Sequence, residues 1–258
     1  METRFRSLTR IYRTKLVVAL VLLGSSLAAM AQSATFAISQ NGKPVGTASY
    51  TFAPNSGGFD STSMVRVSMQ GLSYQLSKNE ELSPNNALKH VQLSAIVNNS
   101  AVSVVAKPDA SQFLLNISAN GRSSTTRLDA HNLTVFLPDF DPGALETLLA
   151  MAASSNNRDL WAIIPKQAGT IEQIQLATYP DEKGTLDGKP IVTHHLIATI
   201  GGSTTVLFAG PENQLLQAEL PQQGFALIRN GFVLTPPVRP LSPPPVPSPA
   251  PASNLPAQ

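Results

Sequence analysis

The sequence predicts a mainly β protein, in which one curled antiparallel sheet forms a half-barrel or barrel-like meander with one principal α-helix. Apolar and polar residues alternate through most of the chain, which is the period of a strand with one buried face. Dipeptides that favour tight hairpin turns separate these segments, among them Asn41-Gly42, Asn120-Gly121 and Asp187-Gly188. A single stretch has the spacing of a helix.

Residues 1–31 are predicted to be a secretory signal peptide. Five basic residues precede the apolar run 16–23, and small residues follow it. Ala29 and Ala31 form an A-x-A site, so we expect cleavage before Gln32. The apolar run is shorter than the roughly 20 residues of a membrane-spanning helix, which favours cleavage over an uncleaved anchor. We therefore expect a periplasmic or secreted protein, with the export signal as its only contact with a membrane.

Charge and cysteine content narrow the function classes. Residues 1–31 hold five of the 18 Lys and Arg residues and one of the 16 Asp and Glu residues, so the rest of the chain has 13 bases against 15 acids. A nucleic-acid partner is disfavoured, because the basic character belongs to the predicted signal peptide. The chain has no cysteine, which excludes a disulfide framework and lipid attachment through an N-terminal cysteine.

One β-rich globular domain is predicted for residues 32–235. Its expected strands are marked by apolar residues at every second position. Before the helix these are Ala48/Tyr50/Phe52, Val65/Val67/Met69, Val91/Leu93/Ala95/Val97, Phe113/Leu115/Ile117/Ala119 and Leu133/Val135/Leu137; after it they are Ile174/Leu176, Val192/Leu196/Ala198/Ile200, Val206/Phe208 and Leu216/Ala218/Leu220.

The one predicted helix runs from Pro142 through Ala153. Asp141 is suited to cap it, Pro142 suits the first helical position, and Leu145, Leu148, Leu149 and Ala152 follow at helical spacing. One such helix is too small to cover the sheet, so the sheet must curl on itself, pack as a sandwich or leave an apolar cavity. The candidate lining residues of a cavity are Val91, Leu93, Val97, Phe113, Leu115 and Trp161.

Residues 236–258 form a predicted disordered, proline-rich tail. They contain ten of the 21 prolines of the chain, which favours an extended polyproline II conformation without a packed core. Such a tail is either a spacer or docking peptide for a partner, or an unstructured end without a specific partner.

No catalytic residue, cofactor or metal site is predicted. The mature chain lacks the nucleophile-elbow, metalloprotease, phosphate-loop and dinucleotide motifs. His194 and His195 are adjacent on a strand and point to opposite faces, and His194 is interpreted as a hydrogen-bonded core histidine rather than an acid or base. Asp139 and Asp141 are interpreted as helix-terminal residues rather than an acid/base pair or cation site. Asp181-Glu182 with Asp187 is expected to be a solvated turn.

The segment Gln40-Asn41-Gly42-Lys43-Pro44-Val45-Gly46-Thr47 resembles the first hairpin, with the pattern x-G-x-x-V-G, of uncharacterised periplasmic domains of bacteria. Segments 187–192 and 213–221 fit the same pattern. Those domains are similar in outline to the lipoprotein-carrier (Lol-type) superfamily. The resemblance implies a strongly curved antiparallel sheet that wraps around helices and encloses an apolar cavity, and it assigns no functional residue.

Three functions follow, in order of preference. The first is an exported, non-enzymatic binding protein for an apolar or amphipathic, lipid-like ligand. The alternative is a structural or interaction module of the cell envelope, with an envelope protein as partner and the proline-rich segment as a tether. A hydrolase that uses Asp139 and Asp141 is the least favoured.

Overall fold

A sheet of 16 strands wrapped around one helix makes up the part of the chain that the computed structural model describes, which is residues 31–155, 159–166 and 168–235. Most of the predicted signal peptide, with Ala29, and the predicted tail lie outside the described residues. Ala31 precedes the first strand, which Gln32 opens. The elements are β1 (Gln32–Gln40), β2 (Lys43–Asn55), β3 (Gly58–Met69), β4 (Leu72–Leu82), β5 (Leu88–Val97), β6 (Ser100–Asp109), β7 (Gln112–Ala119), β8 (Arg122–Asp129), β9 (Leu133–Phe136), α2 (Pro142–Ser155), β10 (Leu160–Ile164), β11 (Thr170–Leu186), β12 (Lys189–Ile200), β13 (Ser203–Ala209), β14 (Leu215–Leu220), β15 (Phe225–Arg229) and β16 (Phe232–Leu234).

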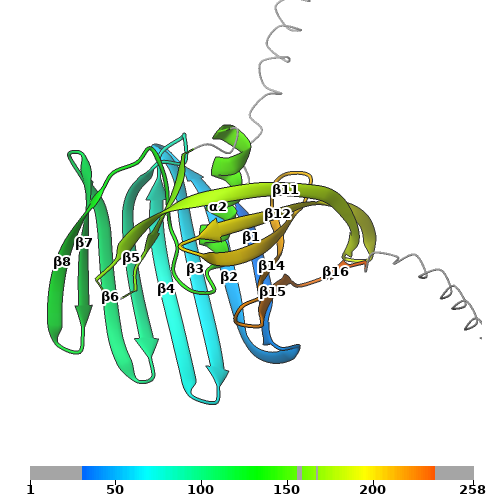
Figure 1. Ribbon diagram of the computed structural model, residues 1–258, viewed down its shortest axis with the longest axis horizontal. Coiled ribbons are helices and arrows are strands. Elements are labelled where there is room, and N and C mark those ends of the chain that lie inside the picture. Colours follow the sequence, from blue (N-terminus) through cyan, green and yellow to red (C-terminus); the bar gives the residue numbers. More distant parts are fainter. Residues whose placement is uncertain (1–30, 156–158, 167, 236–258) are drawn as a thin grey trace, which may run out of the picture.

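Two meanders share this one sheet. Strands β1 to β8 follow one another in order, and β1 also pairs with β15, from which the sheet continues through β14, β13, β12, β11 and β10 to β9. The short strand β16 pairs with β11 outside this path. The sheet curls without closing into a barrel, and its two ends are β8 and β9 (Figure 1). The predicted fold class, mainly β with a curled antiparallel sheet and one helix, is confirmed.

The only parallel pair among the described strands is β9 with β10, where Val135 lies opposite Ala162. These strands flank α2 in the sequence, so strand, helix and strand form a crossover. A parallel pair needs such a long connection, whereas antiparallel neighbours are joined by short turns. The helix thus interrupts an otherwise antiparallel meander and is placed on its inner side.

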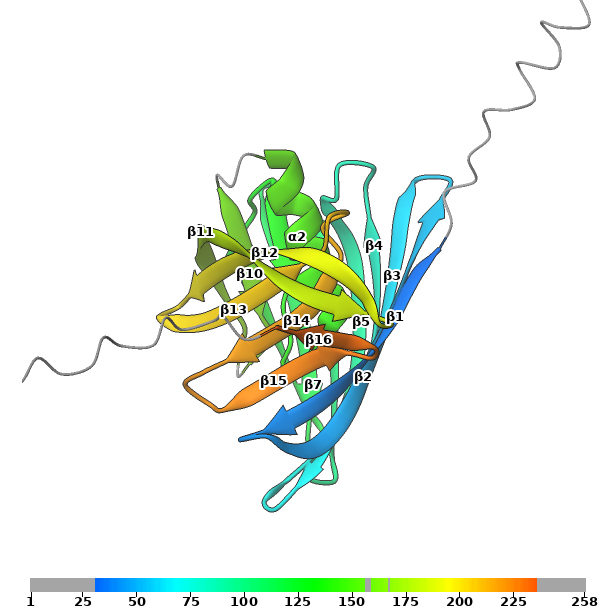
Figure 2. The ribbon, with the colours of Figure 1, turned by 90° about the vertical axis from the view of Figure 1, so that its right-hand side faces the viewer.

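Asp141 begins the helix as predicted. Its Oδ1 accepts hydrogen bonds from the backbone N–H groups of Gly143 at 2.9 Å and Ala144 at 3.2 Å, which is the geometry of an N-cap. The sequence indicates a helix with one apolar face, yet every residue from 141 to 149 is buried. The reason is that α2 lies between the two meanders and contacts β2, β3, β9 and β14, as Figure 2 shows.

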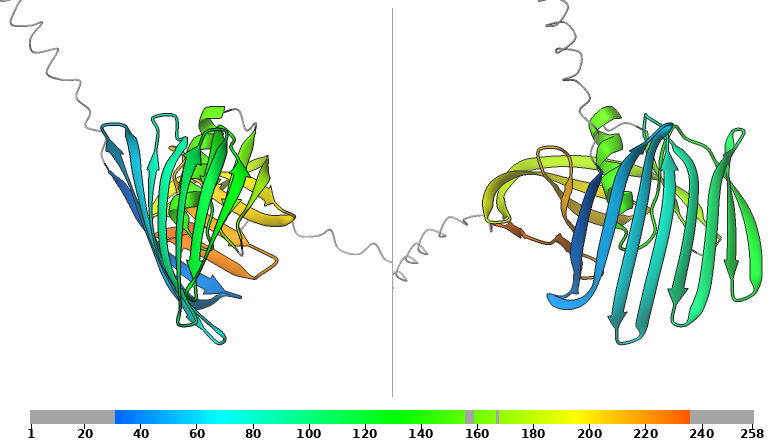
Figure 3. Two further views of the ribbon diagram at one scale, coloured as in Figure 1. Left: turned by 90° about the vertical axis from the view of Figure 1, so that its left-hand side faces the viewer. Right: turned by 180° about the vertical axis from the view of Figure 1, so that it is seen from behind.

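The inner faces of both meanders and the helix form one apolar core. Every second residue is buried over residues 61–67 of β3, 76–82 of β4 and 91–95 of β5, so the expected alternation is confirmed there. The outer face of β1 to β8 is a broad, polar surface that no other described element covers (Figure 3). The core therefore lies inside the curl, on one side of the N-terminal meander.

Strand β12 departs from the predicted pattern. Val192 was assigned to the apolar face with Leu196, but its side chain is 51% exposed while its neighbour Thr193 is fully buried. The pairing of β11 with β12 shifts between Tyr179 and Glu182, and this irregularity changes which residues face inward. Near Val192, therefore, the residues of β12 that face the core are not the ones that the alternation predicted.

No helix in the described part of the chain is both long and apolar enough to span a membrane.

Candidate functional site

An apolar hollow of about 320 Å³ lies on the inner face of the N-terminal meander, where β4 to β7 extend beyond the elements that cover the rest of this face. We call it the inner hollow. Its floor consists of strand residues, which are Tyr74, Leu93, Ala95, Val97, Val102, Val104, Ile117 and Ala119. Its rim consists of two loops, which contribute Pro138, Asp139, Pro165 and Lys166. Its volume is at the lower end of ordinary ligand pockets.

Small side chains create the inner hollow. Ala95, Val102 and Ala119 are direct cross-strand partners, so they form one row across β5, β6 and β7. The same row continues into β4 at Leu76, which is large and buried. Cross-strand neighbours on one face lie about 5 Å apart, so a row of short side chains leaves a depression between taller ones.

A second cavity of about 120 Å³ lies on the other side of the rim, between the loop before α2 and the C-terminal meander. It shares Pro138, Asp139 and Lys166 with the inner hollow. Most of the remaining lining is apolar: Leu137, Phe140, Leu145, Ile164, Ile200, Leu220 and Leu227, with the polar residues Asp141, Ser203, Thr205 and Gln223. The two spaces together offer apolar surface on both sides of a polar rim.

The rim carries one ion pair, and one tyrosine of the floor reaches it with its hydroxyl group. Lys166 Nζ lies 2.9 Å from Asp139 Oδ1, and both side chains are exposed. The Tyr74 hydroxyl donates a 3.4 Å hydrogen bond to the backbone carbonyl of Asp139. Burial raises the pKa of Tyr74 above its ordinary value, and the carboxylates of Asp139 and Asp141 raise it further, so this residue stays a neutral donor. The rim thus presents an ammonium and a hydroxyl beside the apolar floor.

Phe140, in the loop between the two spaces, has an unusual backbone conformation. Its φ is 58°, in the left-handed region that bulky residues rarely adopt. The ring packs edge-on against Tyr74 and Phe225, with centroid distances of 6.1 and 4.7 Å. Such conformations persist where surrounding contacts impose them and gather at functional sites, which supports a role for this loop in shaping the site.

Of the six residues predicted to line a cavity, the structure places two in the inner hollow, Leu93 and Val97. Three others, Val91, Phe113 and Leu115, lie in the packed core. Trp161 is on β10, where its ring stacks on His131 at a centroid distance of 3.6 Å. The alternation identifies the inner face of β5 and β7 correctly, but it does not show which part of that face lines a hollow.

The paired histidines are not core residues. His194 is about half exposed, and its Nδ1 lies 3.1 Å from Asp181 Oδ1. Nδ1 of His195 lies 3.2 Å from Glu182 Oε1, and its ring stacks on Phe208. The interpretation of His194 as a core histidine is therefore wrong. These carboxylates face the histidines across β11 and β12, a long-range strand pairing that sequence separation does not reveal.

Of the two acidic segments, one differs from expectation. Asp181 and Glu182 lie within β11, not in a solvated turn, while Asp187 is in the following turn. Asp139 and Asp141 have separate partners: the exposed Asp139 pairs with Lys166, and Asp141 is buried. They do not form a joint acid/base site.

Sequence reasoning missed a buried cluster of charged residues next to the helix start. Lys78 Nζ lies 2.9 Å from Glu80 Oε2 and 2.8 Å from Asp141 Oδ2, and all three side chains are fully buried. The alternation in β4 contained the signal, because Lys78 and Glu80 are in phase with the buried Leu76 and Leu82. A charged pair at core positions of a strand needs a partner from elsewhere in the fold, and Asp141 is that partner.

A second buried acid connects the helix to the C-terminal meander. Glu146 Oε2 accepts a 2.6 Å hydrogen bond from the backbone N–H of Leu215 in β14. Burial raises the pKa of Glu146, although the hydrogen bond from the Leu215 N–H acts in the opposite direction. Glu146 thus holds α2 and β14 together from the middle of the core.

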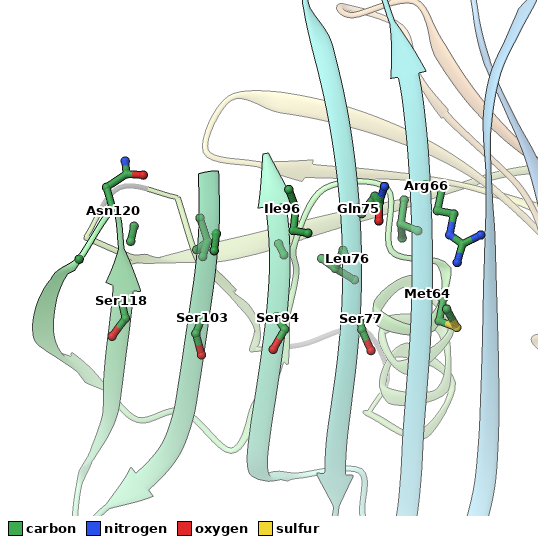
Figure 4. A pocket seen from close by; sticks show the side chains of 16 residues that line it. Met64, Arg66, Gln75, Leu76, Ser77, Ser94, Ile96, Ser103, Ser118 and Asn120 are labelled. Atoms are coloured by element: carbon green, nitrogen blue, oxygen red, sulfur yellow. The ribbon is translucent and has the colours of Figure 1, made fainter. Parts of the chain in front are cut away.

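The outer face carries a larger and more open hollow of about 570 Å³, lined by serine side chains and by the exposed side chains of Met64 and Ile96. Met64, Ser77, Ser94, Ser103 and Ser118 are successive cross-strand partners and form a row on this surface, which Figure 4 shows. No aromatic or charged residue except Arg66 lines it. Because the inner hollow is more enclosed and has the Lys166 ammonium and the Tyr74 hydroxyl at its edge, it is the better candidate for a ligand.

Within the described residues, no group of three or more His, Cys, Asp or Glu side chains is placed to hold a metal ion. Comparison with known proteins gives no match to a protein family, to a curated protein or to a solved structure. The resemblance to periplasmic lipoprotein carriers therefore remains a prediction from the sequence.

Proposed function

We propose that this protein is an exported, non-enzymatic binding protein that holds an apolar or amphipathic, lipid-like ligand in the inner hollow. The observation that carries the proposal is the row Ala95, Val102 and Ala119, whose short side chains leave an apolar hollow beside a polar rim. Burying apolar surface contributes about 25 cal/mol per Å², so an acyl chain laid on this floor gains binding free energy from contact alone.

The rim suits the polar end of such a ligand. The Lys166 ammonium and the Tyr74 hydroxyl stand at the border of the floor, and Asp139 balances the charge of Lys166. If the acidic or zwitterionic head group of a lipid-like ligand lies beside Lys166, the acyl chain of that ligand extends over the floor of the inner hollow or into the 120 Å³ cavity. This arrangement of many apolar and few polar contacts is typical of small-molecule sites.

The test uses a dansyl-labelled fatty acid and the chain without its first 31 residues. Fluorescence should rise on binding to the wild type, and Val102→Trp should abolish the rise because its indole fills the inner hollow. Ala101→Trp is the matched control, since Ala101 is the neighbouring residue of β6 and lies on the outer face. No uptake by the wild type, or equal uptake by Val102→Trp, would contradict the proposal.

The alternative, an envelope module with a proline-rich tether, makes the opposite prediction. In that case the fatty acid should not bind, and deletion of residues 236–258 should remove protein partners recovered from an envelope extract. Binding of the fatty acid that is unchanged by this deletion supports a carrier.

A further inference from the structure

Lys78, Glu80 and Asp141 form an isolated reactive group inside the protein. Their side chains have no exposed surface, and each is within 2.9 Å of at least one other member. The cross-strand partners of Lys78 and Glu80 on β5 are Leu93 and Val91, so the surroundings on that side are apolar. A lysine and a carboxylate held together without water have a chemical alternative to an ion pair, which is condensation to an amide.

We propose that Lys78 and Asp141 condense to an intramolecular isopeptide bond, with Glu80 as the acid and base that transfers the protons. Nζ of Lys78 is the nucleophile, and the side-chain carboxyl carbon of Asp141 is the electrophile. The bond covalently joins β4 to the start of α2. It concerns the folded scaffold and is independent of the proposed ligand.

The helix start activates the carboxyl group of Asp141. Oδ1 accepts hydrogen bonds from the N–H groups of Gly143 and Ala144, whereas Oδ2 faces Lys78. Attack on the carbon moves negative charge onto Oδ1, where two backbone donors and the positive end of the helix dipole are already in place. The oxygen that must leave is therefore the one next to the lysine and its proton source.

Glu80 is held where the proton transfers occur. Its Oε2 lies 2.9 Å from Nζ, and a backbone hydrogen bond from Phe136 also holds its carboxyl group. Burial raises the pKa of Glu80 although the neighbouring Lys78 acts in the opposite direction, so this carboxylate takes up a proton more readily than an exposed one. Burial acts to lower the pKa of Lys78, but the Asp141 and Glu80 carboxylates raise it above its ordinary value, so the reaction starts from the ammonium.

The step balances without an oxidant or any other reactant. The ammonium of Lys78 passes one proton through Glu80 to Oδ2 of Asp141, which leaves an amine and a carboxylic acid. The nitrogen lone pair forms the C–N bond while the C=O electron pair moves to Oδ1. Glu80 then carries a second proton from nitrogen to Oδ2, the C–Oδ2 bond breaks with its electron pair, and C=O forms again. One ion pair becomes one amide and one water, and Glu80 ends as it began.

The buried position favours the product. Two charges in a low-dielectric interior carry a large desolvation cost, and the amide removes both of them. Holding the reacting groups in contact replaces an encounter between separate molecules, which lowers the barrier. The hydroxyls of Ser61 and Ser63, which are buried beside this group without a hydrogen-bond partner among the described residues, give the released water polar neighbours.

The same chain contains a matched control. Lys166 and Asp139 have the same residue types and an Nζ to Oδ1 distance of 2.9 Å, but both side chains are exposed. Water stabilises their charges, and no third carboxyl group within the described residues pairs with Lys166. This pair should remain an ion pair.

Intact mass spectrometry of the wild-type chain, purified from its exported form, tests the proposal without any substitution. The mass should be lower than that of the processed sequence by one water molecule, and proteolysis should yield a branched peptide that joins the segments containing Lys78 and Asp141. Trypsin should not cleave after Lys78 but should cleave after Lys166. The full unlinked mass, or a missing water without the branched peptide, would overturn the proposal.

Two variants test the assigned roles. Lys78→Arg keeps the positive charge but has no amine nucleophile, so its mass should be that of the unlinked chain, whereas Lys166→Arg should still lack one water. Glu80→Gln should leave most of the chain unlinked because the proton carrier is gone. A branched peptide at the wild-type level in Glu80→Gln would refute the role of Glu80. If a variant fails to fold, the wild-type measurement still decides whether the bond exists.

Discussion

Replacement of Glu146 by Gln should make the protein more stable at neutral and higher pH. Glu146 is only 6% exposed and accepts a 2.6 Å hydrogen bond from the N–H of Leu215. Gln keeps a carbonyl oxygen for this hydrogen bond and removes the ionisable group. The comparison therefore isolates the cost of placing a carboxylate in the core.

The sign follows from the raised pKa of Glu146. Below the ordinary glutamate pKa of about 4.3, the carboxyl group is neutral in both the folded and the unfolded chain, and its full stabilising contribution is present. As the pH rises, the Glu146 carboxyl group ionises first in the unfolded chain. Its stabilising contribution then decreases steadily and is completely lost once the pH passes the raised folded-state pKa. Each unit by which the pKa is raised corresponds to about 1.4 kcal/mol.

Urea unfolding of the wild type and Glu146→Gln between pH 4 and pH 8 measures this effect. The difference in unfolding free energy should shift in favour of Glu146→Gln as the pH rises, by about 1–3 kcal/mol over the range. Glu212→Gln is the control, because Glu212 lines the same surface pocket but is exposed. Parallel pH profiles for the wild type and Glu146→Gln would refute the reasoning.

Three further substitutions test the packing, each by urea unfolding. Gly46→Ala should cost about 1–3 kcal/mol because its Cβ would collide with the backbone carbonyl of Arg66; an unchanged midpoint contradicts the close strand approach. Lys78→Met should cost about 3–5 kcal/mol because it leaves the buried Asp141 and Glu80 carboxyl groups without their partner, whereas Lys166→Met at the surface should cost below about 1 kcal/mol; equal losses contradict the buried cluster. Phe140→Gly should be no less stable than Phe140→Ala, because glycine adopts a φ of 58° without strain; a clear deficit relative to alanine argues against the strained loop.

Local sequence patterns predicted much of the fold because they report local geometry. Alternation in β3 and β5 identified the buried face, and the Asp141-Pro142 pair identified the start of the helix. These features depend on residues within a few positions of one another, where propensity and capping act directly. The excess of apolar strand over helix also indicated that the sheet must curl on itself, pack as a sandwich or leave an apolar cavity, and the structure shows the curl.

The candidate site was less predictable because it depends on long-range pairing. Val97 and Val91 have the same phase on β5, yet only Val97 lines the inner hollow while Val91 is fully buried in the core. What separates them is how far the rest of the fold extends over the N-terminal meander. No local sequence pattern reports how far the other elements extend over this meander.

The sequence by itself determined many of the strands, the single helix and its cap, and the surplus of apolar strand face, because alternation, turn chemistry and capping are short-range effects. Only the tertiary structure decided that Asp141 meets Lys78 and Glu80, that Asp181 and Glu182 meet the two histidines, and where the inner face stays uncovered. Those contacts arise from strand order and curvature, which join segments far apart in the chain, and that is where the chemistry proposed for this protein lies.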